Sequence, residues 1–253
     1  MDYTPPGMHY GEVESGELGL RASKTKLFDA LADIAKALST GRRVEIVDLL
    51  AQGERSVYEV AEEIGQSLAN TSHHLRSLAN AGLVSSRRDG THIYYRLAGV
   101  EVELLWSALR ATAEANRADF GQLVSAYIGP VDQYPIVGRS ELIERLKTGA
   151  VTLLDVRPEA EYRAGHISGA HSLPYREVEE RLVNLPVDGD IVAYCRGSYC
   201  VFAPQVVRFL RSKGIAASRL KDGFPEWRRA GLPVTVGADV GAPPFEGSFT
   251  HDS

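Results

Sequence analysis

The chain has 253 residues, more than one average domain, and its 44% hydrophobic composition with 8% aromatics is that of a globular protein with a sizeable core. A net charge of -5 argues against a uniformly basic surface for nucleic acid, although a local basic face is still possible. No run of residues approaches the ~18 apolar residues of a membrane-spanning helix, and the acidic, Gly- and Pro-containing start is unlike a signal peptide. We therefore expect a cytoplasmic protein with no membrane partner.

The first part of the chain predicts a flexible tail followed by helices. Residues 1–22 show no apolar periodicity, and we expect them to form a flexible tail. From Lys24 onward, apolar residues recur at helical spacing, and the stretch "STGRRVEIVDLLAQGE" continues that pattern until Gly53. Two consecutive helices are predicted.

A helix-turn-helix with a hairpin follows. Ser56 is placed to cap a short helix, residues 65–67 form a turn, and a second helix runs from about Leu68 to Asn80 before Gly82. In "LVSSRRDGTHIYYRL" the dipeptide "DG" joins two runs rich in strand-forming residues, which predicts a hairpin. A hairpin directly after a helix-turn-helix is a wing.

The second half of the chain has a different pattern. One long helix is predicted from Val100 to about Tyr127, and Pro130 and Pro135 then mark a linker at residues 128–138. Beyond it, apolar strands such as "VTLLDV" and "DIVAYC" alternate with helices, which predicts a parallel sheet covered by helices on both faces. Residues 237–253 have no periodicity and are expected to form a second flexible tail.

The helix and the wing concentrate positive charge on an acidic chain. Between Gln66 and Arg96 there are four arginines and one acid, Asp89. A helix that enters the major groove needs short polar side chains near its N-terminus, and the wing can hold phosphates. The predicted DNA-binding residues are Ser67, Asn70, Thr71, Ser72, His73, His74, Arg76, Arg87 and Arg88.

The stretch "TSHHLRSLANAGLVSSRRDGTHIYYRL" closely resembles the ArsR family of winged-helix repressors. The resemblance implies an ArsR-type DNA-binding and dimerisation domain at residues 23–127. It further implies a homodimer joined through its first and last long helices and bound to double-stranded DNA at an inverted-repeat operator. The alternative is that the helices and hairpin serve dimerisation alone. The family's usual metal sites lack their cysteine and histidine ligands here, so no metal site is predicted.

Both cysteines of the chain lie in "YCRGSYC". In a reducing compartment such thiols are kept for reactivity or metal binding. Cys195 ends a buried strand, and the backbone N–H groups of the loop and the following helix favour its thiolate. Arg196 would add a nearby cation. The sequence thus predicts a nucleophilic cysteine in an anion-binding loop.

Three segments, "LLDVRPEAEYRAGHISGAHSLPY", "YCRGSYC" and "LKDGFPEWRRAGLPV", look like the successive signatures of a rhodanese domain at residues 139–236. The resemblance implies an α/β rhodanese-like fold and sulfur transfer through a Cys195 persulfide. The partners would be a small sulfur donor such as thiosulfate or a persulfide and a thiol acceptor, with no cofactor. The catalytic residues would be Cys195, Arg196, Gly197, Ser198, Tyr199 and Cys200, with Asp155 and Arg157 bracing the loop.

Cys200 has two interpretations. It is either a small inert filler at the first helical turn or a resolving thiol that attacks persulfidated Cys195. The six-residue loop from Cys195 to Cys200 is followed by Val201, without the arginine of a phosphatase cradle. Sulfur is therefore favoured over phosphorus or arsenic.

Three functions remain open on sequence alone. The chain is a repressor whose rhodanese domain senses or delivers sulfane sulfur, or it is primarily a sulfurtransferase whose winged helix serves dimerisation or autoregulation. A third possibility is an arsenic-related regulator or reductase. The fusion of the two domains favours the first by analogy.

Overall fold

We describe a computed structural model of the chain over residues 10–129, 134–181 and 189–237. The chain forms two compact units, which divide within one helix at Trp106 and Ser107. The winged unit contains residues up to Leu50 and residues 54–106, and the α/β unit contains residues 51–53 and those from Ser107 onward. The sequence placed the domain boundary in a linker at residues 128–138, of which residues 130–133 lie outside the described residues. The tail expected at the C-terminal end also lies outside the described residues beyond Gly237.

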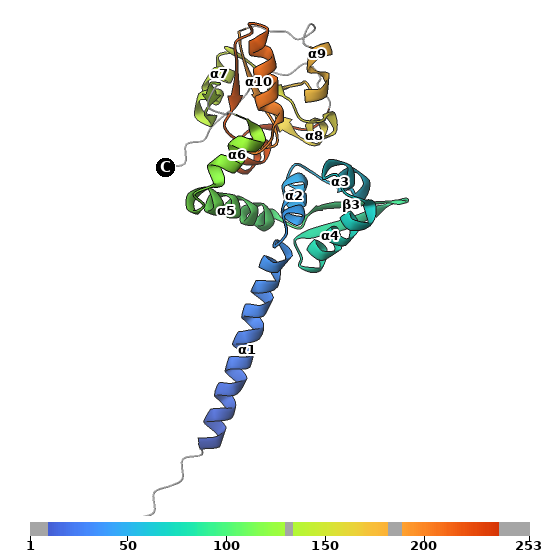
Figure 1. The fold of residues 1–253 in the computed structure, drawn as a ribbon, viewed down its shortest axis with the longest axis vertical. Coiled ribbons are helices and arrows are strands. Elements are labelled where there is room, and N and C mark those ends of the chain that lie inside the picture. Colours follow the sequence, from blue (N-terminus) through green and yellow to red (C-terminus); the bar gives the residue numbers. More distant parts are fainter. Residues whose placement is uncertain (1–9, 130–133, 182–188, 238–253) are drawn as a thin grey trace, which may run out of the picture. The chain divides into compact units, whose positions relative to one another are not determined.

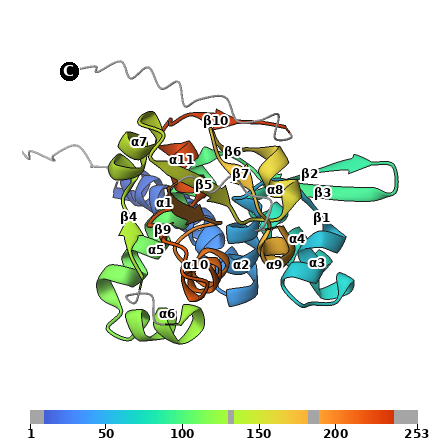
Figure 2. The same ribbon diagram turned by 90° about the horizontal axis from the view of Figure 1, so that it is seen from above.

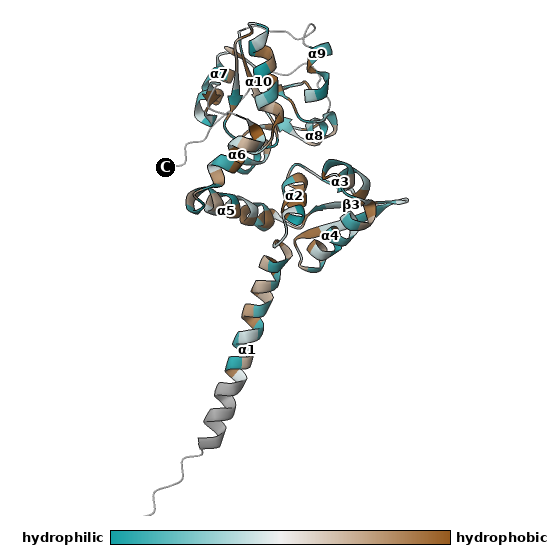
Figure 3. Cartoon of the chain, viewed as in Figure 1, coloured by the Kyte–Doolittle hydropathy of each residue, from teal (hydrophilic) through white to brown (hydrophobic). Residues whose placement is uncertain are grey.

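Helix α1 (Tyr10–Ala37) begins inside the segment expected to be a flexible tail. No proline lies between Tyr10 and Ala37, and each residue that joins an existing helix adds one hydrogen bond. The helix therefore extends toward the N-terminus although that stretch lacks apolar periodicity. Farther along α1, Leu27, Phe28 and Leu31 are exposed, and the helix shows hydrophobic segments between hydrophilic ones (Figure 3).

Three further helices form the core of the winged unit: α2 (Gly41–Leu50), α3 (Val57–Glu63) and α4 (Leu68–Asn80). The predicted cap at Ser56 is present, and Ser67, which was expected in a turn, also caps a helix. The Ser56 hydroxyl accepts from the Glu59 backbone N–H at 3.2 Å, and the Glu59 carboxylate accepts from the Ser56 N–H at 2.7 Å. The Ser67 hydroxyl accepts from the Asn70 N–H at 3.3 Å and starts α4. The helix-turn-helix is confirmed.

Strands β2 (Val84–Asp89) and β3 (His92–Leu97) form the predicted antiparallel hairpin, with Asp89 opposite His92. Gly90 in its turn has φ of +58°, a left-handed conformation that favours glycine. The short strand β1 (Arg55–Ser56) pairs with β3 on its other edge. The hairpin projects beyond α3 and α4 in both views (Figures 1 and 2).

The long helix expected at residues 100–127 is two helices, α5 (Val100–Asn116) and α6 (Phe120–Ile128). The break contains Arg117 and Asp119, whose side chains pair at 2.9 Å. Asn and Asp are weak helix formers, because their short polar side chains compete for backbone hydrogen bonds. Asn116 and Asp119 flank the break, so local sequence explains it.

The α/β unit is built on a five-stranded parallel sheet in the order β4–β9–β8–β5–β7. A separate antiparallel pair joins β6 to β10. The strands are β4 (Ile136–Val137), β5 (Val151–Asp155), β6 (His166–Ile167), β7 (His171–Ser172), β8 (Asp190–Tyr194), β9 (Ala217–Leu220) and β10 (Val234–Thr235). The helices are α7 (Arg139–Lys147), α8 (Glu159–Ala164), the 3-10 turn η2 (Tyr175–Glu177), α9 (Val178–Arg181), α10 (Phe202–Ser212) and α11 (Phe224–Arg229).

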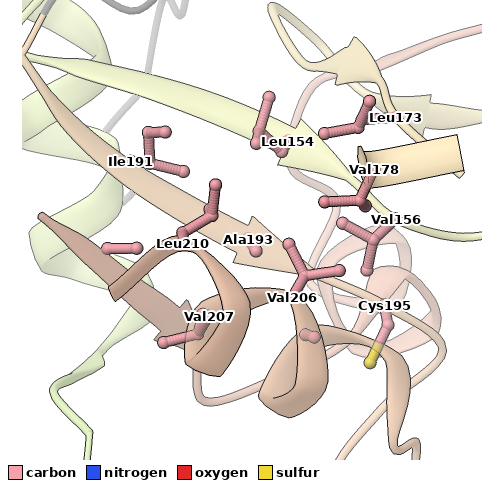
Figure 4. Close-up of a cluster of buried hydrophobic side chains, with 12 residues drawn as sticks. Leu154, Val156, Leu173, Val178, Ile191, Ala193, Cys195, Val206, Val207 and Leu210 are labelled. Atoms are coloured by element: carbon pink, nitrogen blue, oxygen red, sulfur yellow. The ribbon is translucent and has the colours of Figure 1, made fainter. Parts of the chain in front are cut away.

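Helices cover both faces of this sheet, as predicted. On one face, Leu154 of β5 packs in a cluster with Val207 and Leu210 of α10 (Figure 4). On the other face, the adjacent Leu153 packs in a cluster with Leu142 of α7 and Trp227 of α11. Successive strand residues point to opposite faces, so a strand buried on both faces is apolar at nearly every position.

Further differences from the predicted elements lie in the α/β unit, where the short strands β4, β6 and β10 were not predicted. One of the helices expected between the apolar strands, at "YREVEERLVNL", is present as η2 and α9, and residues 182–188 lie outside the described residues. Strand β9 was not predicted, because Arg219 interrupts its apolar pattern. None of the helices in the described ranges is both long and apolar enough to cross a membrane.

Candidate functional site

Cys195 lies directly after β8, at the carboxyl end of a strand with sheet neighbours on both sides. This is the edge at which parallel α/β sheets bind ligands. Its side chain is only 3% exposed and belongs to the same apolar cluster as Val206 of α10. Figure 4 shows the sulfur at the margin of that cluster. A reagent must therefore come into close contact with the loop to reach the thiol.

The loop favours the thiolate of Cys195. Burial raises the pKa of this thiol, but a hydrogen bond from the Cys200 side chain lowers it. Backbone hydrogen bonds from Ala203 and Gly197 lower it further, and the net shift is downward. Ala203 is in the first turn of α10, so the positive end of that helix faces the sulfur, as predicted from sequence.

Cys200 is the partner of this thiolate. Burial raises the pKa of Cys200 well above its ordinary value, and the hydrogen bond to Cys195 and the negative charge there raise it further. The Cys195 Sγ also lies 3.8 Å from the carbonyl oxygen of Gly197 and 3.7 Å from that of Cys200. The loop therefore holds two thiols whose pKa values are shifted in opposite directions, that of Cys195 downward and that of Cys200 upward.

Asp155 and Arg157 form a fully buried ion pair beneath the loop. The Arg157 Nη2 donates to the Asp155 carboxylate at 2.6 Å and to the Gly165 carbonyl at 2.7 Å, and neither side chain is exposed. Tyr194, which precedes Cys195, donates its hydroxyl to Asp155 at 2.6 Å. Burial and Asp155 raise the pKa of Tyr194, which keeps the phenol protonated as a donor. The pair thus fixes the end of β8.

Arg196 does not act as the free cation that the sequence suggested. Its Nη2 donates to the Glu161 carboxylate at 2.6 Å and its Nε at 2.9 Å, and the Glu161 side chain is fully buried. The positive charge of Arg196 is therefore compensated. Arg196 anchors the start of the loop to α8, and Glu161 is a site residue that sequence reasoning missed.

A second loop closes against the first. A Cβ atom on Gly223 would lie 2.3 Å from the backbone nitrogen of Gly197, so a side chain there would collide with the cysteine loop. The Phe224 N–H donates to the Cys195 carbonyl at 3.1 Å, and the Glu226 carboxylate accepts from the Gly223 N–H at 3.0 Å. The sequence analysis did not identify this close approach of Gly223 to the loop.

Tyr199 and Ser198 form the outer part of the loop and are half-buried. Within the α/β unit, the Tyr199 hydroxyl donates to the Glu114 carboxylate of α5, and the Tyr199 ring meets Phe120 of α6 edge-on at 5.7 Å. Arg110 of α5 pairs with Glu226. No sequence signal marked these contacts, because they join segments about 85 to 116 residues apart.

The predicted DNA-reading residues divide into exposed and buried positions. Ser67, Asn70, His73 and Arg76 are exposed on α4, and Ser72 is half-buried. Thr71 is a correction: it is fully buried in the core, on the opposite side of the helix. Thr71 lies one turn before Leu75 and two turns before Leu78, so it shares their buried face of the helix.

His74 also points away from the predicted reading face. Burial lowers its pKa, and the charges of Arg43, His73 and Arg42 lower it further, so the ring is neutral at pH 7. Its Nδ1 is buried and has no hydrogen-bond partner among the described residues. His74 therefore packs toward α2, whereas the exposed Asn80 shares the side of α4 that carries Arg76 and had not been identified.

The two arginines of the wing, Arg87 and Arg88, have different partners. Arg87 donates to both carboxylate oxygens of Glu54 at 2.9 and 2.6 Å and pairs with Asp89 at 3.1 Å. These hydrogen bonds raise the pKa of Arg87. Arg88, one residue on, donates from its Nε to the Gly90 carbonyl at 3.1 Å and forms no ion pair with a described acidic side chain. Arg88 is thus better placed for a phosphate than Arg87.

The described residues contain no group of three or more His, Cys, Asp or Glu side chains arranged to hold a metal ion.

Comparison with known proteins relates both parts of the chain to families. Residues 139–230 match the rhodanese-like domain, and residues 40–86 match bacterial regulatory proteins of the arsR family. The HTH-type transcriptional regulator Rv0324 of Mycobacterium tuberculosis is 47% identical over 218 residues, which cover 86% of this chain and 96% of that protein. A sulfurtransferase of Allochromatium vinosum is 33% identical over 102 residues, 40% of this chain and 94% of that protein.

Among solved structures, the homodimeric winged helix-turn-helix DNA-binding domain of Mb0332 from Mycobacterium bovis is 44% identical. The match covers 37% of this chain and 87% of that one, with a TM-score of 0.36.

Removing the buried carboxylate should destabilise the α/β unit. We expect Asp155→Ala to lower its free energy of unfolding by about 3 to 5 kcal/mol, because Arg157 is left as an uncompensated buried charge. The measurement is urea denaturation followed by fluorescence in a Trp106→Phe background, which leaves Trp227 of the α/β unit as the reporter. The matched control is Asp190→Ala, a 56% exposed ion-pair partner of Arg145, with an expected loss under about 1 kcal/mol. Equal losses would contradict the assignment.

The rate of Cys195 alkylation should report the hydrogen bond from Cys200. The thiolate is the reactive form, so the rate rises as pH passes through the pKa of Cys195. Since that pKa is lowered by Cys200, the midpoint should move to higher pH in Cys200→Ala and less in Cys200→Ser, whose hydroxyl can still donate. The measurement is iodoacetamide labelling of Cys195 followed by peptide mass spectrometry across neutral and alkaline pH. An identical midpoint in all three proteins would show that Cys200 does not act on this thiol.

Proposed function

This chain belongs to the ArsR family of helix-turn-helix transcriptional regulators and carries a C-terminal rhodanese-like domain, and from that premise we propose that it is a repressor controlled by sulfane sulfur. The observation that carries the proposal is the state of Cys195. A thiol at the end of β8, with its pKa lowered by Cys200 and by the start of α10, is a nucleophile for sulfur.

The proposed sulfur step is a displacement at sulfur. The Cys195 thiolate attacks the outer sulfur of thiosulfate, the sulfur–sulfur bond of the donor breaks, and sulfite leaves with the electron pair. Cys195 then carries a persulfide anion, which the N-terminal end of α10 stabilises. A thiol acceptor attacks the outer sulfur and restores the Cys195 thiolate. The related protein of Allochromatium vinosum is named a sulfurtransferase, which supports this chemistry.

The winged unit supplies the contact to DNA. Helix α4 presents Asn70, His73 and Arg76 as the side chains that reach base edges or phosphates in the major groove. Its N-terminus, capped by Ser67, is suited to a backbone phosphate. Arg88 extends the interface to the wing. Thr71 and His74 are omitted from this proposed interface because they face the protein interior.

A second copy of the chain would cover the apolar side of α1. Leu20, Leu27, Phe28 and Leu31 are 57 to 72% exposed and follow a heptad-like spacing. Apolar side chains so arranged on a long helix are typical of a helix-to-helix interface. A two-fold homodimer formed in this way would place two copies of α4 on an inverted-repeat operator, about one DNA turn apart.

Helix α5 offers the connection between sulfur and DNA. It begins in the winged unit, and its second half belongs to the α/β unit. There Glu114 accepts a hydrogen bond from Tyr199 of the cysteine loop, and Arg110 pairs with Glu226 beside Gly197. A sulfur atom added to Cys195 would change this loop. Helix α5 is the element through which we expect that change to reach the winged unit.

Two alternatives are outcomes of the tests below. One is a chain that acts mainly as a sulfurtransferase, with the winged unit used for dimerisation or autoregulation. The other is an arsenic-related regulator or reductase, which the absence of an arginine after the cysteine loop disfavours.

Arg88 should contribute one phosphate contact and Arg87 should be restrained by Glu54. We expect Arg88→Ala to weaken binding to all DNA sequences and to reduce the slope of log affinity against log salt by about one. Glu54→Gln should strengthen binding generally, because it releases Arg87 and removes a negative charge. Fluorescence anisotropy on the chain's own upstream DNA and on unrelated DNA, at several salt concentrations, measures both. An unchanged slope in Arg88→Ala would remove the wing from the interface.

Sulfane sulfur should lower the affinity for DNA through Cys195. We expect the wild-type protein to lose at least about fivefold in affinity for its upstream DNA after treatment with thiosulfate, at one fixed salt concentration. Cys195→Ser should bind with the untreated wild-type affinity before and after treatment. If both proteins bind equally well throughout, the domains are not coupled and the sulfurtransferase alternative takes the lead. Loss of binding in untreated Cys195→Ser would show that the thiol is structural.

A further inference from the structure

The second thiol of the chain has no part in the sulfur step described above. Cys195 and Cys200 are the two cysteines of the sequence, and both are free thiols in the same loop. Simple sulfur transfer needs one of them. The position of Cys200 therefore requires its own explanation.

The loop brings the two cysteine residues together. The Cys200 N–H donates to the Gly197 carbonyl at 3.1 Å, which closes a turn, and the Cys195 Sγ lies 3.7 Å from the Cys200 carbonyl oxygen. Cys200 also packs against the apolar cluster that contains Cys195. The turn thus holds Cys200 beside the atom that would carry the transferred sulfur, and each thiol shifts the pKa of the other.

Access also favours Cys200 over an external acceptor. The Cys195 side chain is 3% exposed, so a thiol from solution must enter a nearly closed loop. A thiol in the same loop needs no diffusional encounter, and groups held in this way react as if present at very high concentration. An internal reaction of Cys200 will therefore precede an external one.

The proton needed for that reaction is in place. Burial and the neighbouring negative charge raise the pKa of Cys200, so it is a thiol in the resting loop. A persulfide anion on Cys195 can release its outer sulfur only if that sulfur takes up a proton. Cys200, in the same loop, is a thiol that can supply this proton.

Resting on the proposed sulfur transfer, we propose that Cys200 is a resolving thiol that converts the Cys195 persulfide into an internal disulfide. The Cys200 Sγ attacks the Cys195 Sγ, a bond forms between them, and the bond from the Cys195 Sγ to the outer sulfur breaks. The Cys200 proton goes to the outer sulfur, which leaves as hydrosulfide with the electron pair. One negative charge is present before and after, and no oxidant is needed.

This reaction replaces the persulfide of the loop by a disulfide. The product is a closed Cys195–Cys200 disulfide, which persists after the sulfur has left and is reset by an external thiol or dithiol. The sulfur is released as hydrosulfide instead of being handed to an acceptor. The loop then has two forms, dithiol and disulfide, and the disulfide ties the start of α10 to the end of β8.

The test separates this proposal from the sulfur transfer on which it rests. The full-length protein is incubated with thiosulfate and no other thiol, and sulfite and hydrosulfide are both measured together with the intact mass. Sulfite reports formation of the Cys195 persulfide. Hydrosulfide reports the action of Cys200. Peptide mapping locates any bound sulfur.

We expect the wild type to release one sulfite and one hydrosulfide per chain and to become lighter by two hydrogen atoms. Cys200→Ser should release sulfite more slowly to the same final yield, release at least tenfold less hydrosulfide, and become heavier by one sulfur atom. Cys200→Ala provides a second variant, and the circular dichroism of both variants verifies that they are folded. Cys195→Ser should release neither product.

Two results would overturn the resolving role while leaving sulfur transfer intact. One is a wild-type protein that releases sulfite and retains the added sulfur on Cys195. The other is a persulfide mapped to Cys200, which would mean that the outer sulfur had migrated. A wild type that releases no sulfite would instead overturn the proposed function itself.

Discussion

The buried pair of Asp155 and Arg157 is the interaction on which the cysteine site depends. The Asp155 carboxylate accepts from Arg157 and from the Tyr194 hydroxyl, whereas the buried Nη1 of Arg157 has no hydrogen-bond partner among the described residues. Arg157 also reaches the Gly165 carbonyl and lies over the Phe224 ring at 4.2 Å. These contacts join the ends of β5 and β8 to two loops, and so they fix the position at which Cys195 leaves the sheet.

The chemistry of the loop follows from that position. Because Cys195 is held at the start of α10, the helix end and the Cys200 thiol both stabilise its negative charge despite burial. The same burial keeps Cys200 protonated. One loop therefore contains a thiol with a lowered pKa and a thiol with a raised pKa, the two groups that the proposed sulfur chemistry uses. Arg196 contributes by anchoring the loop to α8, since its charge is balanced by Glu161.

The winged unit is subject to a different constraint, which is that one side of α4 must pack and the other must stay polar. Thr71 is buried, whereas Asn70 and His73 are exposed, as helical periodicity requires. On the wing, Glu54 holds Arg87 and leaves Arg88 to the solvent side. In this way a chain with a net charge of -5 has a small basic surface, part of whose positive charge is balanced by Glu54.

The sequence by itself determined the helix-turn-helix with its wing, the alternation of strands and helices that forms the parallel sheet, and the place of Cys195 at the end of a strand. Those features depend on apolar periodicity and on capping residues such as Ser56, which act between neighbours in the chain. Only the tertiary structure decided which partners the charged groups took. The pairing of Arg196 with Glu161 and of Arg87 with Glu54, and the contact of Tyr199 with Glu114, join residues about 33 to 85 positions apart. Local patterns carry no information about such partners, because the partner is set by packing across the fold.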